Sequence, residues 1–210
     1  MSSIECGLLR ASDTDDAAHL LAVAFSTADP PAIAVGLTEA EIEQFATPLC
    51  AKAVTDGLTV VARSLPSNQF AGVLLTDDFA MPPTFSTTSF SHKFLPILTM
   101  LDGLDEEYRK SHSVPAGQYL HLFMLAVDGH FSGRGIAQQL VTACLSNGNA
   151  KGYTHAITEA TGVVSQHVFR KLGFTDRLRA SYRDYRYQGR AVFASIGNHE
   201  AAILMDRATT

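Results

Sequence analysis

The sequence lacks the features that mark several broad classes of protein. Its three cysteines, Cys6, Cys50 and Cys144, are odd in number and far apart, so they fit neither a metal motif nor a disulfide framework and suit a reducing compartment. The net charge of −5 argues against nucleic acid as the main partner. No apolar run is long enough to span a membrane, and the N-terminus has no basic and apolar segments of a signal peptide. We therefore expect a cytoplasmic protein with no metal ion, nucleic-acid partner or membrane partner.

What the chain does contain is the pattern of one α/β (α+β) domain. Its 210 residues are enough for one well-packed core, and we expect a single domain over residues 1–210, with a loop and a helix inserted at about 77–117. Helix caps, Pro and Gly breaks and β-rich runs divide the chain into alternating elements. The expected strands are 4–9, 58–63, 70–75, 119–127, 153–159, 190–196 and 201–205, and the expected helices are 12–25, 38–56, 136–147 and 162–172. A strand–helix–strand unit lies at the centre, with hairpins at both ends.

The insertion carries an apolar stripe at helical spacing, which predicts one more helix. The stripe consists of Phe94, Leu95, Leu98, Leu101, Leu104 and Tyr108. Core packing is the commoner role of such a face, and lining a substrate pocket is the alternative. Upstream, Pro82-Pro83 and the Ser/Thr cluster through Ser91 are typical of a loop.

The stretch from residue 119 to residue 137 carries the most specific signal. Tyr119–Val127 is almost wholly apolar, as expected of a strand that is buried on both faces. It leads through the turn Gly133-Arg134-Gly135 into a helix, whose first N–H groups are unpaired and can bind an anion such as a pyrophosphate. The turn matches neither the dinucleotide fingerprint nor the nucleotide P-loop.

Two sequence blocks resemble the GNAT superfamily of N-acetyltransferases. The family's cofactor motif, Arg/Gln-x-x-Gly-x-Gly/Ala after a strand that ends in Val, is similar to Ser132-Gly-Arg-Gly-Ile-Ala137 after Leu125-Ala-Val127. The family's second pattern, which ends in Gly-Phe, is similar to Gly162–Phe174. Ser132 stands where Arg or Gln is usual, Gly162 where Asn is usual, and Phe169 where Tyr is usual. Asp29-Pro30, the insertion and Tyr182-Arg-Asp-Tyr185 resemble the arylalkylamine N-acetyltransferase branch.

This resemblance implies a GNAT-like fold and a site for acetyl-CoA. The fold would be a mixed, mostly antiparallel sheet of about seven strands, with helices on both faces and a splayed strand pair that holds CoA. By the same resemblance, the Leu125 N–H would polarise the thioester carbonyl and the Val127 N–H would meet the pantetheine arm. The residues expected to bind CoA are Leu125, Ala126, Val127, Ser132, Gly133, Arg134, Gly135, Ile136, Ala137, Ser165 and Phe169.

His121 is the first candidate for the general base, because the pKa of an imidazole suits proton removal near neutral pH. Strand alternation places it on the same face as Phe123, Leu125 and Val127. A buried histidine held by a neighbouring carbonyl is the alternative. Asp29 is the second candidate, aligned with a Glu of the insect branch, although Asp before Pro is also a plain turn residue.

Other polar residues complete the expected site. Glu159 ends the strand beside the cofactor strand and could orient a substrate or be solvated. Ser165 could supply a proton, bind CoA or cap its helix. Phe169 cannot donate a proton. The alternative acids, Tyr182, Tyr185 and Tyr187, are first of all strand formers. We expect catalysis by His121, Asp29 and Ser165, and a substrate pocket formed by Asp29, Phe94, Phe123, Glu159 and Tyr185.

The sequence therefore predicts an acetyl-CoA-dependent N-acetyltransferase that acts on a small primary amine, such as an arylalkylamine, as a monomer or homodimer. Two alternatives stay open. The departures at Ser132, Gly162 and Phe169 would also fit an acyl-CoA-binding sensor that does not turn over. An open groove would instead fit acetylation of a peptide or protein.

Overall fold

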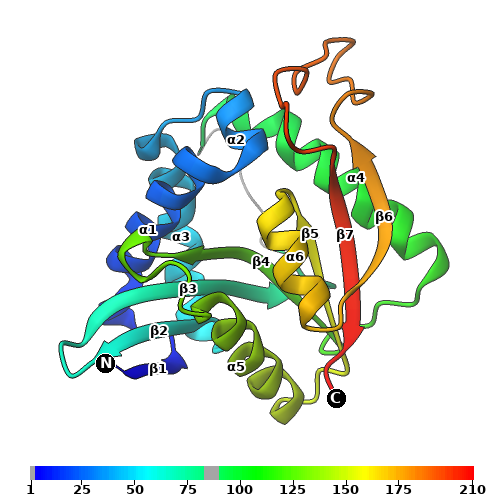
Figure 1. Cartoon of the computed structure of the whole chain (residues 1–210). Helices are drawn as coiled ribbons and strands as arrows, with labels where there is room; N and C mark the ends of the chain where they lie inside the picture. Colours follow the sequence, from blue (N-terminus) through cyan, green and yellow to red (C-terminus); the bar gives the residue numbers. More distant parts are fainter. Residues whose placement is uncertain (1–2, 83–89) are drawn as a thin grey trace.

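The fold is built around one seven-stranded sheet in the order β1-β2-β3-β4-β5-β7-β6 (Figure 1). The computed structural model describes residues 3–82 and 90–210. Neighbouring strands run antiparallel, except for β4 and β5, which are parallel. The predicted mixed, mostly antiparallel sheet is confirmed. The strands are β1 (Ser3–Leu8), β2 (Val60–Leu65), β3 (Gln69–Asp78), β4 (Tyr119–Val127), β5 (His155–Ala160), β6 (Thr175–Ser181) and β7 (Ala201–Ala208).

Helices cover both faces of the sheet, as expected. One face carries α1 (Thr14–Ala28), α2 (Pro30–Ala34), α3 (Glu39–Asp56) and α4 (Leu95–Ser111). The other face carries α5 (Ile136–Ala150) and α6 (Val163–Lys171). Each face has its own buried apolar cluster, one with residues of α1, α3 and α4, and one with residues of α5 and α6. The sheet is thus the middle layer of three, and a residue on it faces one cluster or the other.

Local sequence signals determine where α1 ends and where α2 and α3 begin. Thr38 and Glu41 form the predicted capping box of α3, since Glu41 N–H donates to Thr38 Oγ1 over 3.3 Å and Thr38 N–H donates to Glu41 Oε2 over 2.9 Å. α1 ends before Asp29, which is extended and begins α2 as its N-cap. Pro30 and Pro31 occupy the first turn of α2, where a missing N–H costs no hydrogen bond.

A bulge interrupts β4 at Phe123. The register between β3 and β4 shifts there by one residue, so Phe123 has no opposite residue on β3. Phe123 packs with the cluster of α1, α3 and α4, whereas Leu125 and Val127 pack with the cluster of α5 and α6. The prediction that His121 shares one face with all three is therefore wrong. Periodicity assumes an unbroken strand, and the bulge reverses it.

The C-terminal region also differs from the prediction. Residues 190–196 form turns rather than a strand, and the sheet is completed by β6, which pairs with β7. β6 is a charged, mostly exposed edge strand, so it lacks the apolar alternation that marks a strand in sequence. The apolar character of 190–196 has another cause. Phe193 is buried there, and its ring packs against Tyr182 and Tyr185.

The insertion contains the expected helix, α4. Its far end is tied to the sheet, because the Tyr108 hydroxyl donates to Asp206 Oδ2 of β7 over 2.6 Å. The part of the expected loop at 83–89 lies outside the described residues. Within residues 3–82 and 90–210, none of the helices has the length and hydrophobicity needed to cross a membrane.

Candidate active site

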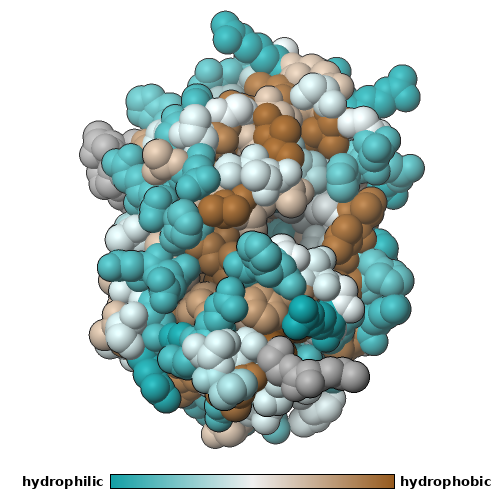
Figure 2. Space-filling model, turned by 60° about the vertical axis from the view of Figure 1, so that its left-hand side comes forward, coloured by the Kyte–Doolittle hydropathy of each residue, from teal (hydrophilic) through white to brown (hydrophobic). Residues whose placement is uncertain are grey.

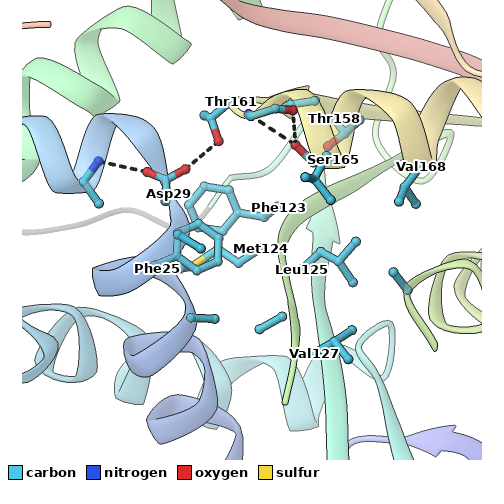
Figure 3. A pocket seen from close by; sticks show the side chains of 18 of the residues that line it. Phe25, Asp29, Phe123, Met124, Leu125, Val127, Thr158, Thr161, Ser165 and Val168 are labelled. Atoms are coloured by element: carbon cyan, nitrogen blue, oxygen red, sulfur yellow. Dashed lines mark hydrogen bonds between the residues drawn. The ribbon is translucent and has the colours of Figure 1, made fainter. Parts of the chain in front are cut away.

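A cavity of about 700 Å³ opens between β4 and β5. Its walls come from both faces of the sheet, with α1 to α4 on one side and the glycine turn, α5 and α6 on the other. Figure 3 shows Phe25, Asp29 and Phe123 close together at one end, with Leu125 and Val127 farther along β4. On the face in Figure 2, hydrophobic side chains lie exposed between hydrophilic ones. Because the cavity passes through the sheet layer, two molecules can meet in it from opposite faces.

The cavity exists because β4 and β5 separate. Their pairing joins Tyr119–His121 to His155–Ile157 and then stops. At the point of separation, the Thr158 hydroxyl donates to the Leu122 carbonyl over 2.8 Å. A side-chain hydrogen bond there takes the place of the main-chain hydrogen bonds between β4 and β5. The expected splayed strand pair is therefore present.

The main chain of β4 presents donors to this opening. Asp128 N–H donates to the Ala71 carbonyl on β3 over 3.0 Å. In an antiparallel pair, successive residues direct their N–H groups alternately to one neighbour and the other. The N–H groups of Leu125 and Val127 therefore point to the side of β5, where the two strands no longer pair.

The glycine turn supplies a second set of donors. Gly133 and Gly135 have φ angles of 73° and 73°, in the left-handed region that favours glycine. Gly135 is the N-cap of α5 and offers no side-chain cap, and Gln139 N–H makes the first bond of the helix, to the Gly135 carbonyl over 3.1 Å. The preceding N–H groups of α5 are left for a ligand, and the positive end of the helix favours an anion there.

The expected cofactor residues come together around these donors, with one exception. Arg134 does not line the cavity, and its guanidinium lies 5.2 Å from the centre of the Phe131 ring. Ser132 is exposed at the rim. The others that line the cavity are Leu125, Ala126, Val127, Gly133, Gly135, Ile136, Ala137, Ser165 and Phe169.

Asp29 is the carboxylate at the end of the cavity between α1 and α2. Its Oδ2 accepts the Ala32 N–H over 2.9 Å, and its Oδ1 accepts the Thr161 hydroxyl over 2.5 Å (Figure 3). Burial raises the pKa of Asp29, and the hydrogen bonds from Thr161 and Ala32 partly oppose that rise. Asp29 therefore has the turn role that its sequence suggests and also presents a proton acceptor to the cavity.

His121 lies between two carboxylates of neighbouring strands. Its Nδ1 is 2.9 Å from Asp77 Oδ1 and its Nε2 is 2.8 Å from Glu159 Oε2. Burial opposes the charged form, but the two carboxylates raise the pKa of His121 well above its usual value. A raised pKa favours the imidazolium, which would donate an N–H to each carboxylate, and the ring does not line the cavity. This geometry does not support a role as the base, since each ring nitrogen already lies within hydrogen-bond distance of a carboxylate.

Glu159 lines the cavity, and its carboxyl group interacts with that of Asp105 of α4, which does not line it. Although burial opposes its ionisation, the charge and hydrogen bond of His121 lower the pKa of Glu159. Burial and the charge of Glu159 raise the pKa of Asp105 to about 9. Glu159 Oε1 and Asp105 Oδ1 are buried without a hydrogen-bond partner. A proton on Asp105, which its raised pKa favours, would satisfy one of them.

Residues 100–174 match the model of the Acetyltransferase (GNAT) family. The fold is that of the GNAT acetyltransferases. The chain is similar to the C-terminal condensation domain of Ebony in complex with β-alanyl-dopamine, with 16% identity, coverage of 99% of this chain and 100% of that one, and a TM-score of 0.91. It is also similar to arylalkylamine N-acetyltransferase 2 from Aedes aegypti, with 23% identity, coverage of 99% of this chain and 100% of that one, and a TM-score of 0.82. A third similar structure is polyamine N-acetyltransferase of Drosophila melanogaster, which forms N-acetylagmatine, with 20% identity, coverage of 98% of this chain and 100% of that one, and a TM-score of 0.77.

Where GNAT enzymes usually have Tyr, this chain places Phe169 in the cavity wall. Ser165 also lines the cavity, but its hydroxyl donates to the Gly162 carbonyl over 2.9 Å and accepts the Gly162 N–H over 3.3 Å. Ser165 therefore acts as part of the cap of α6 in this geometry.

The tyrosines expected as alternative acids lie behind the wall. Tyr182 is buried and donates to the Thr161 carbonyl over 2.6 Å, and Tyr185 donates to the Pro96 carbonyl over 3.2 Å. Tyr187 pairs with Arg190 in an isolated bridge. Among the residues that the structure describes, no tyrosine lines the cavity, and Tyr185 is thus outside the pocket that it was expected to form.

The apolar stripe of α4 serves both of the roles that its sequence allows. Phe94, Leu98 and Leu101 line the cavity, whereas Leu104 and Tyr108 are buried in the core. Phe123, also expected in the substrate pocket, lines the same wall. This wall of the cavity is therefore mostly apolar, with Asp29 and Glu159 as its carboxylates.

Three residues that contact the candidate site residues escaped the sequence analysis. Thr161 fixes Asp29, Asp77 holds His121, and Asp105 pairs with Glu159. Asp77 and Thr161 each lie two residues after the end of an expected strand. A single sequence does not show which residues of other strands or helices they contact. Asp105 follows Leu101 of the apolar stripe by four positions, and that helical spacing was the one available signal.

Proposed function

We propose that the chain is an acyl-CoA-dependent N-acyltransferase that transfers an acetyl group to a small primary amine, with arylalkylamines as candidate acceptors. One observation carries this proposal. A cavity through the sheet has unpaired main-chain donors on one side and a carboxylate with a raised pKa, Asp29, on the other. The activities named for the similar GNAT structures, arylalkylamine and polyamine N-acetylation, support it.

The donor side fits a CoA thioester. The free N–H groups at the start of α5 would hold the pyrophosphate, and Ser132 adds a hydroxyl where the family has a cation or an amide. The Val127 N–H would bind the pantetheine arm. The Leu125 N–H would donate to the thioester carbonyl oxygen, where negative charge develops. Acetyl-CoA supplies the activated acetyl group.

On the acceptor side, Asp29 takes the role that the sequence assigned first to His121. Asp29 removes a proton from the incoming ammonium, and the amine nitrogen then forms its bond to the acetyl carbon. The nitrogen then gives up a second proton, the carbon–sulfur bond breaks, and the thiolate leaves with the electron pair and takes up a proton from the nitrogen or from water. Because burial raises the pKa of Asp29, its carboxylate is a better proton acceptor than an exposed one. We infer that the thiolate leaves without a tyrosine acid, since none of the cavity residues described is a tyrosine.

The apolar wall suits the carbon skeleton of the amine. Phe25, Phe94 and Phe123 line it together with Leu98 and Leu101. Aromatic or alkyl groups packed there would be stabilised by about 25 cal/mol for each Å² of apolar surface buried.

The test is release of free thiol from acetyl-CoA across a panel of primary amines, with the acetylated product identified by mass. The panel contains tyramine, dopamine, serotonin, linear diamines and simple alkylamines. We expect turnover with at least one of them. Tight CoA binding without amine-dependent thiol release from any would contradict the proposal.

A second candidate is an acyl-CoA-binding sensor of the same fold. The observation that favours it is the loss of the family's Tyr at Phe169, with no tyrosine among the described cavity residues to replace it. It predicts that CoA raises the melting temperature and that no amine is acetylated. Any amine-dependent turnover rules it out.

A further inference from the structure

The cavity continues from Asp29 into the apolar core on one face of the sheet. Ala28, Phe25 and Ala24 of α1 all line it, and they precede Asp29 by one, four and five residues. At about 1.5 Å per residue, the cavity therefore follows α1 for about 7 Å from Asp29. The part that we call the deep chamber is lined by Ala24 and by residues that belong to the apolar cluster of this face or pack against it, namely Leu37, Ile42, Phe45, Phe94, Ile97, Leu98 and Leu101.

The wall of the deep chamber has no side-chain nitrogen or oxygen among the residues that the structure describes. Most of its residues lie inside α3 or α4, where the main-chain N–H and carbonyl groups bond to each other. A ligand hydroxyl or charged group placed there loses its hydrogen bonds to water and finds no partner, which lowers affinity by at least about tenfold. A hydrocarbon group instead gains about fourfold in affinity for each CH₂ that is buried.

The polar side chains on β5 and just after it do not change this balance. The Thr158 hydroxyl donates to a carbonyl of β4 over 2.8 Å, and the Thr161 hydroxyl donates to Asp29. The side chain of Glu159 is only 3% exposed, and its Oε1 is buried. An amine held at Asp29 therefore has an apolar surface for its tail.

We propose that the deep chamber binds an unbranched hydrocarbon tail, so that the acceptor is a linear primary alkylamine without a second polar group. The ammonium lies at Asp29, and the alkyl chain lies in the deep chamber. This inference rests on the proposed function, because that function places the reacting amine at Asp29. A hydroxyl on an aromatic ring, or a second cation at the end of the chain, would meet a wall that offers it no partner.

The helical part of the wall gives the length of the chain that fits. Phe94 and Leu101 both line the cavity and are seven residues apart, which corresponds to about 10 Å along the helix. Since carbon–carbon bonds are about 1.5 Å long, an extended alkyl chain advances by about 1.25 Å per carbon, and about eight carbons span this wall. Affinity should therefore rise with chain length up to about eight carbons and then level off.

Calorimetric titration of the whole protein, saturated with CoA, tests the deep chamber without requiring turnover. The probes are n-butylamine and three compounds with the same eight-carbon chain: n-octylamine, 8-amino-1-octanol and 1,8-diaminooctane. We expect n-octylamine to bind on the order of 100-fold more tightly than n-butylamine, because four CH₂ groups are added. The terminal hydroxyl or second cation should lower affinity by at least about tenfold relative to n-octylamine. Equal affinity for the two monoamines, or no loss from either terminal group, would overturn the proposal.

Matched variants locate the effect. Ala24→Leu fills the deep chamber about 7 Å from Asp29, beyond the reach of a four-carbon chain. It should weaken n-octylamine binding at least about tenfold and n-butylamine binding less than about threefold. The control is Val23→Leu, which should change neither, because Val23 is 36% exposed and does not line the cavity.

A third variant reverses the selection against polar tails. Leu98→Gln places an amide in the wall, so the difference in affinity between n-octylamine and 8-amino-1-octanol should shrink at least about fivefold. Thermal unfolding checks that each variant is folded. Unchanged n-octylamine binding by Ala24→Leu, or an unchanged difference between the two probes in Leu98→Gln, would contradict the proposal.

The outcomes separate the deep chamber from the enzyme proposal. If amines are acetylated but neither affinity nor rate depends on chain length, the inference about the deep chamber fails and the acetyltransferase stands. If affinity rises with chain length but no amine is acetylated, the inference stands and the acetyltransferase fails. Tighter binding of tyramine than of n-octylamine would assign the deep chamber to a hydroxylated aryl group and overturn the inference.

Discussion

Replacement of Asp29 by Asn separates the chemistry of this residue from its structural role. Asn keeps the size and one acceptor oxygen of the side chain but cannot take a proton from an ammonium. The oxygen can still accept the Ala32 N–H, which Asp29 receives at 2.9 Å as the N-cap of α2. The Thr161 hydroxyl, which donates to Asp29, can turn to accept a proton from the amide instead.

The magnitudes of the two effects should differ sharply. Loss of a general base typically lowers the rate by about 10²–10⁴-fold, so we expect kcat/KM to fall by that factor. Asn and Asp are equally good N-caps, so the free energy of unfolding should change by less than about 0.5 kcal/mol. Asp29→Ala removes the cap as well and should cost about 1 kcal/mol. That corresponds to a fall in melting temperature of about 2–4 °C for a chain of this length.

The assay is the initial rate of thiol release at saturating acetyl-CoA, measured from pH 5 to pH 9 beside thermal unfolding and CoA binding. Because burial raises the pKa of Asp29, the wild-type rate should fall at acid pH with an apparent pKa above the ordinary value of an aspartate. Asp29→Asn should lose this acid limb and bind CoA normally. A rate within about threefold of wild type, with folding intact, would refute the assignment of Asp29 as the base.

Two further predictions concern stability and the donor site. The pKa of Asp105 is raised to about 9, so the folded state holds a proton that the unfolded state loses near pH 4. The free energy of unfolding of the wild type should therefore fall as pH rises from about 4 to about 9. In Asp105→Asn, urea unfolding should show a weaker fall over the same pH range. A fall of equal slope in both proteins would contradict the proton on Asp105. Gly135→Val puts a branched side chain at a φ of 73°, at the N-cap of the α5 donors, and should weaken CoA binding by at least about tenfold. The control is Gly103→Ala on α4, where the added methyl group meets open space, and its CoA affinity should be unchanged. Normal CoA affinity in Gly135→Val would argue against the turn as the phosphate site.

The sequence predicted the parts of the fold that local chemistry determines. Tyr119–Val127 has the bounds expected from its apolar run, and the capping box of Thr38 and Glu41 starts α3 as expected. β6 was missed because an edge strand has little apolar surface to bury, so its alternation is absent. The strand expected at 190–196 was wrong because the buried Phe193 looked like part of a strand.

The parts of the site that come from one continuous segment could be predicted from the sequence. The parts that depend on contacts between distant segments could not. The glycine turn and the outward N–H groups of Leu125 and Val127 belong to consecutive residues, so a motif could indicate them. The setting of His121 depends on Asp77 and Glu159, which are 44 and 38 residues away along the chain. The bulge at Phe123 also depends on the register with β3. Neither tertiary feature leaves a local signal.

The most direct test of the account is amine-dependent release of CoA from acetyl-CoA by the wild-type protein, with the product identified by mass. The account predicts a stoichiometric N-acetylated amine, formed by Asp29→Asn with a kcat/KM that is about 10²–10⁴-fold lower. CoA binding without any N-acetylated product, across the whole panel of primary amines, would contradict it.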